Sequence, residues 1–173
     1  MASVLEVAKT KWEMVQPGED GGIDANLLLM ASESICSILD AFTGMGIVKS
    51  DMESNIAKIR ANITKRGGST SLQQMVDDEL KSGVPAGEAA AGGAHDDTTA
   101  CALTWLKRAL RLVEGLLRGL VEDKTKDLGT CANESYNVAL YPYHGWAAYA
   151  AVKVRAGPMT RIWPQTLRCG ADA

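Results

Sequence analysis

The chain has 173 residues, of which 46% are hydrophobic and 23% are charged. This balance is typical of one globular domain with a real core, and it excludes a disordered chain. The net charge of −3 excludes the global basic field that draws proteins to nucleic acid or to anionic lipid, so any membrane contact has to be local and mostly apolar.

The N-terminus and the cysteines both bear on where the protein works. The segment MASVLEVAKTKWEM lacks the long apolar stretch of a secretory signal, and no run approaches the roughly 18 apolar residues of a membrane span. No cysteine belongs to a CxxC pair, and the spacing does not suggest a zinc site; they are Cys36, Cys101, Cys131 and Cys169. We therefore expect a cytoplasmic protein whose free thiols pack as small apolar groups.

Helical periodicity runs through the chain, and no segment shows the alternation typical of strands. Residues 24–43 are predicted as a first long helix, which Gly44 and Gly46 end. Residues 49–65 are predicted as a second helix and residues 71–82 as a short third one.

The second half of the chain begins with a segment rich in glycine and alanine. Residues 83–97, GVPAGEAAAGGAHDD, predict a flexible surface loop. The strongest helix follows over residues 98–123, with Trp105 toward the edge of an apolar side that extends from Leu103 to Val121. Further helices are expected over about 131–141 and 144–155, separated by Pro142.

The predicted second helix carries polar side chains in an unusual place. At about 100° per residue, one narrow strip holds Asp51, Asn55, Lys58 and Asn62. A strip of apolar residues lies beside it, made of Met52, Ile56, Ile59 and Ile63. The polar row therefore lies on the shoulder of the buried face, whereas most polar groups of a surface helix point away from the core.

The chemistry of this polar row suits a sugar. A carboxylate accepts two hydroxyl hydrogens, and an amide and an ammonium add directional donors. The alternative is an ordinary exposed helix face with an ion pair, which contributes a few tenths of a kcal/mol at most.

Three aromatic or imidazole side chains also have two interpretations each. Trp105 could stack on the apolar face of a sugar ring, or it could be a core residue. His144 could make one hydrogen bond deep in a pocket, or it could cap a helix after Pro142. Trp146 could insert at a membrane interface, or it could simply pack.

Enzymatic chemistry finds no support in the motifs. The chain has no glycine-rich phosphate loop, no GxSxG elbow and no HExxH pair. His95 lies beside Asp96 and Asp97, but a solvated loop is favoured there over a weak metal site. The run Asp77-Asp78-Glu79 predicts a solvated acidic face. We therefore expect no enzyme, no catalytic residue, no metal and no cofactor.

Three segments together resemble the glycolipid transfer protein family. DMESNIAKI is similar to the family's DxxxNxxK segment, TWLKRALRL to its W-L-K-R-x-L segment, and YHGW to its HGW segment, in the family's order between about residues 24 and 168. The resemblance implies an all-α two-layer helical sandwich, here one domain over residues 1–173. It also implies a protein that moves sphingolipids between membranes through the cytosol without enzymatic activity.

The resemblance also implies roles for single residues. Asp51, Asn55 and Lys58 would hydrogen-bond the first sugar, and Trp105 would stack beneath it. His144 would bind the ceramide amide carbonyl, and Asp51 would also accept the amide N–H. Periodicity suggests that the acyl chains lie among Leu39, Phe42, Ile56, Leu106, Leu110 and Ala147. The partners expected are thus a glycosphingolipid and, transiently, membranes; the oligomeric state stays open.

Two alternatives stay open within this resemblance. A related branch of the superfamily binds ceramide-1-phosphate, and there the positions of Asn55 and Trp105 tend to be lysine and arginine, which suit a phosphate. Lys58, Arg108 and Arg111 keep that ligand as an alternative. Family members also continue with a long C-terminal helix that this chain is expected to lack, which makes a sphingolipid sensor without transfer activity the second alternative.

Overall fold

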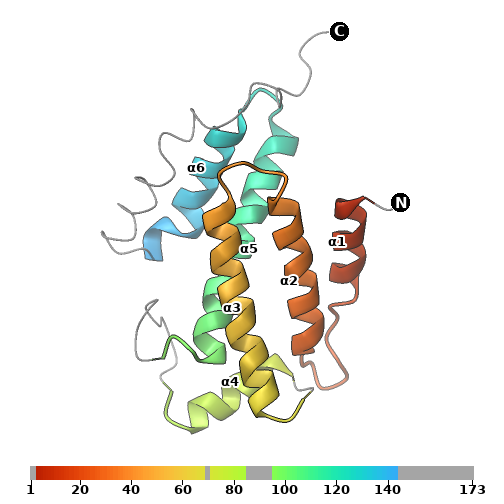
Figure 1. Ribbon diagram of the computed structural model, residues 1–173, viewed down its shortest axis with the longest axis vertical. Helices are drawn as coiled ribbons and strands as arrows, with labels where there is room; N and C mark the ends of the chain where they lie inside the picture. Colours follow the sequence, from red (N-terminus) through yellow and green to blue (C-terminus); the bar gives the residue numbers. More distant parts are fainter. Residues whose placement is uncertain (1–2, 69–70, 85–94, 144–173) are drawn as a thin grey trace. The chain divides into compact units, whose positions relative to one another are not determined.

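A computed structural model describes residues 3–68, 71–84 and 95–143 of the protein, and helices with their connecting turns make up these ranges (Figure 1). The elements are α1 (Val4–Glu13), α2 (Ala25–Leu39), α3 (Gly46–Lys65), α4 (Leu72–Lys81), α5 (Thr99–Glu122), α6 (Leu128–Ala139) and the 3₁₀ turn η1 (Tyr141–Tyr143). Two isolated antiparallel bridges join Pro17 to Ile23 and Asp24 to Ser71. The all-helical fold predicted from the sequence is confirmed.

The chain divides into two compact units. The first comprises Met1–Ala41 and Gly46–Lys107, and the second comprises Phe42–Met45 and Arg108–Ala173. Helix α5 begins in the first unit and continues in the second. Within the described ranges, no helix combines the length and the apolar content that crossing a bilayer requires.

Helix α1 is the element that the periodicity did not predict. Ser3 and Glu6 form a capping box, in which Glu6 N donates to Ser3 Oγ at 3.2 Å and Ser3 N donates to Glu6 Oε2 at 2.6 Å. The S-x-x-E spacing was therefore the signal available in the sequence. Helix α1 buries Ala8 and packs against α2.

Side-chain caps set the ends of the helices that the sequence did predict. Asp24 accepts from Leu27 N at 3.0 Å at the start of α2, and Asp127 accepts from Thr130 N at 2.7 Å at the start of α6. The cap at Asp127 begins α6 three residues before the predicted start.

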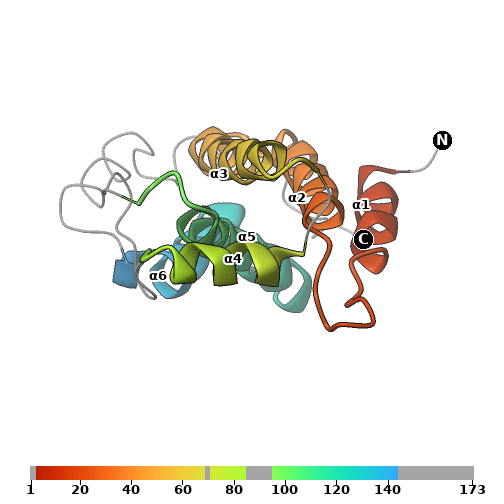
Figure 2. The ribbon, with the colours of Figure 1, turned by 90° about the horizontal axis from the view of Figure 1, so that it is seen from below.

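In the first unit, α2 packs against both α1 and α3, and the three helices lie side by side (Figures 1 and 2). Arg66, just after α3, ties α4 to the end of that helix. Its guanidinium donates to Asp78 Oδ2 at 2.7 Å and to the backbone oxygen of Met75 at 3.3 Å. Met52, Ile59 and Met75 are fully buried and belong to the core of this unit.

Helix α5 places Trp105 in the middle of its buried face, not toward the edge as expected. Trp105 is 6% exposed, and Ala102 and Ala109, one turn on either side, are fully covered. Val121, which was expected on the apolar side, is 75% exposed. The apolar side of α5 was predicted at the wrong angle because small alanines give a weak hydrophobic signal. Alanines nevertheless allow neighbouring segments to pack closely.

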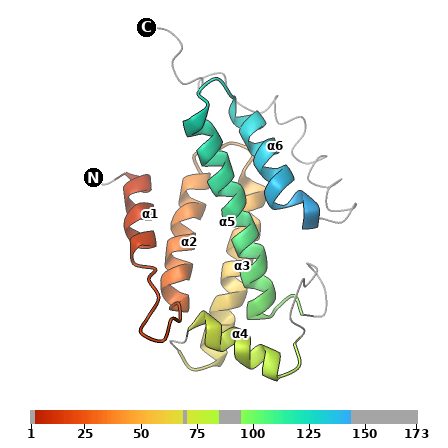
Figure 3. The same ribbon diagram turned by 180° about the vertical axis from the view of Figure 1, so that it is seen from behind.

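In the second unit, α5 and α6 approach closely at two glycines (Figure 3). A Cβ at Gly115 would collide with Ser135 Oγ, and one at Gly119 would lie 3.1 Å from Cys131 Sγ. Ser135 Oγ donates a 2.7 Å hydrogen bond to the backbone oxygen of Leu112. The absent side chains therefore let α6 lie directly against the backbone of α5.

Candidate functional site

Helix α3 has the two adjoining strips that the sequence predicted. The apolar strip is buried: Met52 and Ile59 are 0% exposed, and Ile56 and Ile63 are also covered. On the polar strip Asn55 is buried, Lys58 is half-buried and Asp51 is exposed. The polar strip thus passes from the core to the surface on one shoulder of the helix, where a polar group could meet a ligand with apolar side chains beneath it.

Asp51 and Asn55 lie one helical turn apart at the N-terminal end of this strip. Asn55 Nδ2 donates to the backbone oxygen of Asp51 at 2.8 Å. Desolvation by the surrounding protein raises the pKa of Asp51; Lys58 and Asn55 lower it, and Asp96 raises it further. A poorly solvated carboxylate is a strong acceptor for hydroxyl hydrogens. As the pH falls, this acceptor form is lost at a higher pH than in an ordinary aspartate.

Lys58 has a partner that the sequence interpretation missed. Its Nζ lies 2.6 Å from Asp96 Oδ2, and the two side chains are 26% and 32% exposed. Asp96 was expected in a solvated loop, because GAHDD reads as flexible. The structure instead brings Asp96 to the polar strip of α3, 38 residues earlier in the chain. No signal in the sequence pattern links these two positions.

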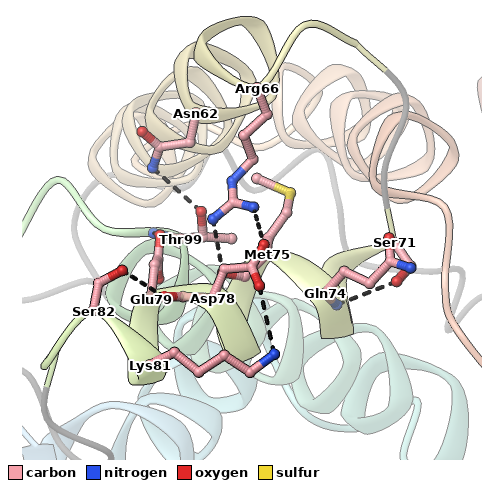
Figure 4. Close-up of polar contacts among 10 residues, drawn as sticks. All are labelled: Asn62, Arg66, Ser71, Gln74, Met75, Asp78, Glu79, Lys81, Ser82 and Thr99. Atoms are coloured by element: carbon pink, nitrogen blue, oxygen red, sulfur yellow. Dashed lines mark hydrogen bonds and ion pairs between the residues drawn. The ribbon is translucent and has the colours of Figure 1, made fainter.

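Polar side chains from α3 and α4 hold the segment between Asp96 and the first turn of α5 (Figure 4). Asn62 Nδ2 donates to the backbone oxygen of Asp97 at 2.9 Å and to Thr99 Oγ1 at 3.3 Å. Glu79 accepts from the backbone N–H groups of Thr99 and Ala100 at 2.6 and 2.8 Å. The start of α5 is therefore fixed to both preceding helices.

The run Asp77-Asp78-Glu79 is therefore only in part the solvated face that was expected, because Glu79 is turned to the start of α5. Asp78 pairs with Arg66, whose hydrogen bond is the largest influence that lowers the pKa of this carboxyl. Glu79 occupies the positive end of the α5 dipole, where a carboxylate is favourable. Asp77 and Asp78 are both exposed, and Glu79 is half-buried. Thr98 caps the start of α5, because Cys101 N donates to its Oγ1 at 3.2 Å.

Replacing Glu79 with glutamine is expected to lower the free energy of unfolding by about 1 to 2 kcal/mol. Glutamine has only one acceptor oxygen, and its NH₂ group would face a backbone N–H. Urea denaturation followed by circular dichroism measures the change. Asp77→Asn removes an exposed charge from the same helix and serves as the control. Equal stability of the two variants would contradict the capping role.

Trp105 is covered in this structure, as an indole of the core would be. A sugar could therefore reach the ring face only after the groups that cover it have moved. The stacking role implied by the family resemblance stays a prediction.

His144 and Trp146 lie outside the described residues, as does Ala147 of the expected acyl-chain lining. The description ends at Tyr143, in the turn directly before His144. Within the second unit, the Arg108 guanidinium carbon lies 3.5 Å from the centroid of the Tyr143 ring, a cation–π contact. The chain that leads to His144 is thereby tied to α5.

A cavity of about 340 Å³ lies elsewhere on α3, between this helix and α2. Its lining is mostly polar and charged: Glu33, Cys36, Ser37, Lys49, Glu53, Ile56, Ala57 and Arg60. Arg60 pairs with Glu33 at 2.6 Å, and Lys49 pairs with Asp40. Ligand pockets are mostly apolar, and this one contains no residue of the polar strip, so it does not serve as the head-group site.

Sequence comparison finds relatives over most of the chain. The family described as Glycolipid transfer protein (GLTP) matches residues 23–159. Human Pleckstrin homology domain-containing family A member 8 is 31% identical over 154 residues, which are 86% of this chain and 28% of that protein. Arabidopsis thaliana Glycolipid transfer protein 3 is 27% identical over 162 residues, which are 88% of this chain and 64% of that protein. The chain thus spans about a quarter and just under two thirds of the length of these two relatives.

Solved structures show the same arrangement of helices. HET-C2, a fungal glycolipid transfer protein, superposes with a TM-score of 0.72 at 25% identity, over 90% of this chain and 76% of that one. Human ceramide-1-phosphate transfer protein in complex with 2:0 ceramide-1-phosphate gives 0.70 at 23% identity, over 90% and 75%, and supports the fold alone. With the family match over residues 23–159, these likenesses show that the chain belongs to the glycolipid transfer protein family and has its fold.

Proposed function

We propose that this chain, as one domain, binds a glycosphingolipid and transfers it between membranes without covalent chemistry. The observation that carries the proposal is the pair of Asp51 and Asn55 on α3: a carboxyl whose pKa is raised by desolvation, one turn from a buried amide that donates to the backbone oxygen of Asp51, next to a buried apolar strip. Such a pair offers acceptors and donors to neighbouring hydroxyls of one sugar ring. Family membership supplies the lipid class.

The energetics of extraction explain why both strips are needed. The protein has to replace the membrane around the acyl chains, and burial of each CH₂ contributes about 0.8 kcal/mol. It also has to satisfy the head group, because an unpaired carboxylate or amide beneath the lipid costs about 1 to 3 kcal/mol. The apolar strip therefore supplies affinity, and the polar strip supplies selectivity.

The remaining head-group roles belong to the same proposal. Lys58 adds an ammonium donor, Trp105 stacks beneath the sugar, and His144 binds the ceramide amide carbonyl. Trp146 touches the membrane, which the protein visits as a peripheral protein of the cytoplasm. A relative in structure is described as selecting simple glycosphingolipids using this fold; it is 27% identical, with a TM-score of 0.64 over 83% of this chain and 67% of that one.

Ceramide-1-phosphate is the second candidate ligand. The presence of the Lys58 ammonium in the polar strip favours it. Two of the three cations that a phosphate would use are already engaged, however. Lys58 pairs with Asp96, and Arg108 stacks on Tyr143. A sugar needs no free cation, so the observed pairing favours the neutral head group.

Transfer of fluorescent galactosylceramide between vesicles tests the proposal, with fluorescent ceramide-1-phosphate as the parallel substrate. We expect galactosylceramide to move at least about tenfold faster than ceramide-1-phosphate, since one charge-assisted hydrogen bond corresponds to about 1.5 to 3 kcal/mol. Faster movement of ceramide-1-phosphate would select the phosphate ligand. Binding of galactosylceramide without movement between vesicles would select a sphingolipid sensor instead.

A further inference from the structure

Resting on the proposed function, we infer that Asp96 is a selectivity residue of the head-group site. It neutralises Lys58 and places a second carboxylate near Asp51, so that the site accepts hydroxyl groups and rejects a phosphate. The ion pair of Lys58 Nζ with Asp96 Oδ2 at 2.6 Å carries this inference.

The first step is the strength of the ion pair. Both side chains are about two thirds or more covered, with 26% and 32% exposure. Charges in such a partly desolvated position are screened less than charges on an open surface. A phosphate that approaches Lys58 therefore has to compete with a carboxylate that is already in contact with it.

The second step is the placement of Asp96, which hydrogen bonds on both sides of it maintain. Thr98 N and Thr98 Oγ1 both donate to the backbone oxygen of His95, at 3.1 and 2.7 Å. Asn62 Nδ2 donates to the backbone oxygen of Asp97 at 2.9 Å. The turn that carries Asp96 is thus anchored to α3 independently of the carboxylate, so Asp96 faces Lys58 before any ligand arrives.

The third step is the charge of the cluster. Asp51, Lys58 and Asp96 together have a formal charge of −1, and the cluster would be neutral without Asp96. Asp96 contacts Lys58 on the same strip of α3 that carries Asp51, and its charge contributes to raising the pKa of Asp51. A sugar hydroxyl can donate to either carboxylate, whereas an anionic phosphate is repelled by both.

Asp96→Asn tests the inference and keeps an acceptor oxygen for Lys58. In the vesicle assay, we expect the rate ratio of ceramide-1-phosphate to galactosylceramide to rise about tenfold, in line with the removal of one nearby, partly screened charge. Asp97→Asn is the matched control, because it removes the same charge from the next, exposed residue. It is expected to leave the ratio within about twofold, as a surface charge does.

A second measurement does not depend on lipid transfer. Inorganic phosphate is titrated into both variants and wild type, and the backbone amide shifts of Asn55 and Lys58 are followed by NMR. Tighter phosphate binding in Asp96→Asn alone supports the inference, even if wild type transfers neither lipid and the proposed function fails. Unchanged phosphate binding in folded Asp96→Asn overturns the inference, as does an unchanged rate ratio in a wild type that transfers galactosylceramide.

Discussion

Asp51→Val is expected to lower the rate of galactosylceramide transfer by about a hundredfold, the equivalent of one or two charge-assisted hydrogen bonds to the sugar. Valine keeps the bulk of the side chain near Cβ but accepts no hydrogen. Asp51 lies at the surface end of the polar strip, and the hydrogen bond of Asn55 to the backbone oxygen of residue 51 survives the change. Helix content, measured by far-ultraviolet circular dichroism, is therefore expected to stay the same.

Glu53→Val provides the matched control for this experiment. Glu53 is also an exposed carboxylate of α3, but it lines the cavity between α2 and α3, with its Oε1 3.8 Å from Lys49 Nζ. Its replacement changes helix propensity in the same way and leaves the head-group site untouched, so transfer should fall by less than about twofold. Equal rates for Asp51→Val and wild type would remove Asp51 from the site. Equal losses in the two variants would point to a general effect on the helix.

Trp105→Ala is expected to lower the free energy of unfolding by about 3 to 5 kcal/mol, as removal of a buried aromatic side chain does. Trp105 is 6% exposed and lies between two fully covered alanines of α5, so the missing indole leaves a cavity that its surroundings fill only in part. Urea denaturation measures this loss. Trp12→Ala, at a half-buried tryptophan of α1, should cost clearly less.

The stacking role of Trp105 needs a variant that keeps the fold. Trp105→Phe retains an aromatic face and most of the volume. Its smaller ring should weaken the binding of sugar-bearing lipids more than the binding of simple ceramides. Equal losses for both kinds of lipid, with the fold intact, would assign the tryptophan to the core alone. A loss of stability of less than about 1 kcal/mol in Trp105→Ala would contradict the buried placement.

Most of the helices could be predicted because their causes are local. Periodic apolar residues and the caps at Asp24, Ser71 and Asp127 act within a few positions of the chain, and they place α2, α4 and α6 to within a few residues. The two strips of α3 follow from helix geometry alone. Even the missed helix α1 had a local signal in the capping box of Ser3 and Glu6.

The sequence alone thus establishes that the protein is all-helical and that a polar strip lies on the shoulder of α3. Both features depend on side chains that are only one or two helical turns apart. The setting of that strip comes from contacts across the fold. Lys58 meets Asp96 over 38 positions, and Glu79 meets the first N–H groups of α5 over 20. Composition makes Asp96 look like part of a solvated loop. The hydrogen bonds of Asn62 and Glu79 to the residues after Asp96 instead hold it beside Lys58. The charge of the site is therefore a property of tertiary contacts, because Coulomb interactions follow distance in space rather than distance along the chain.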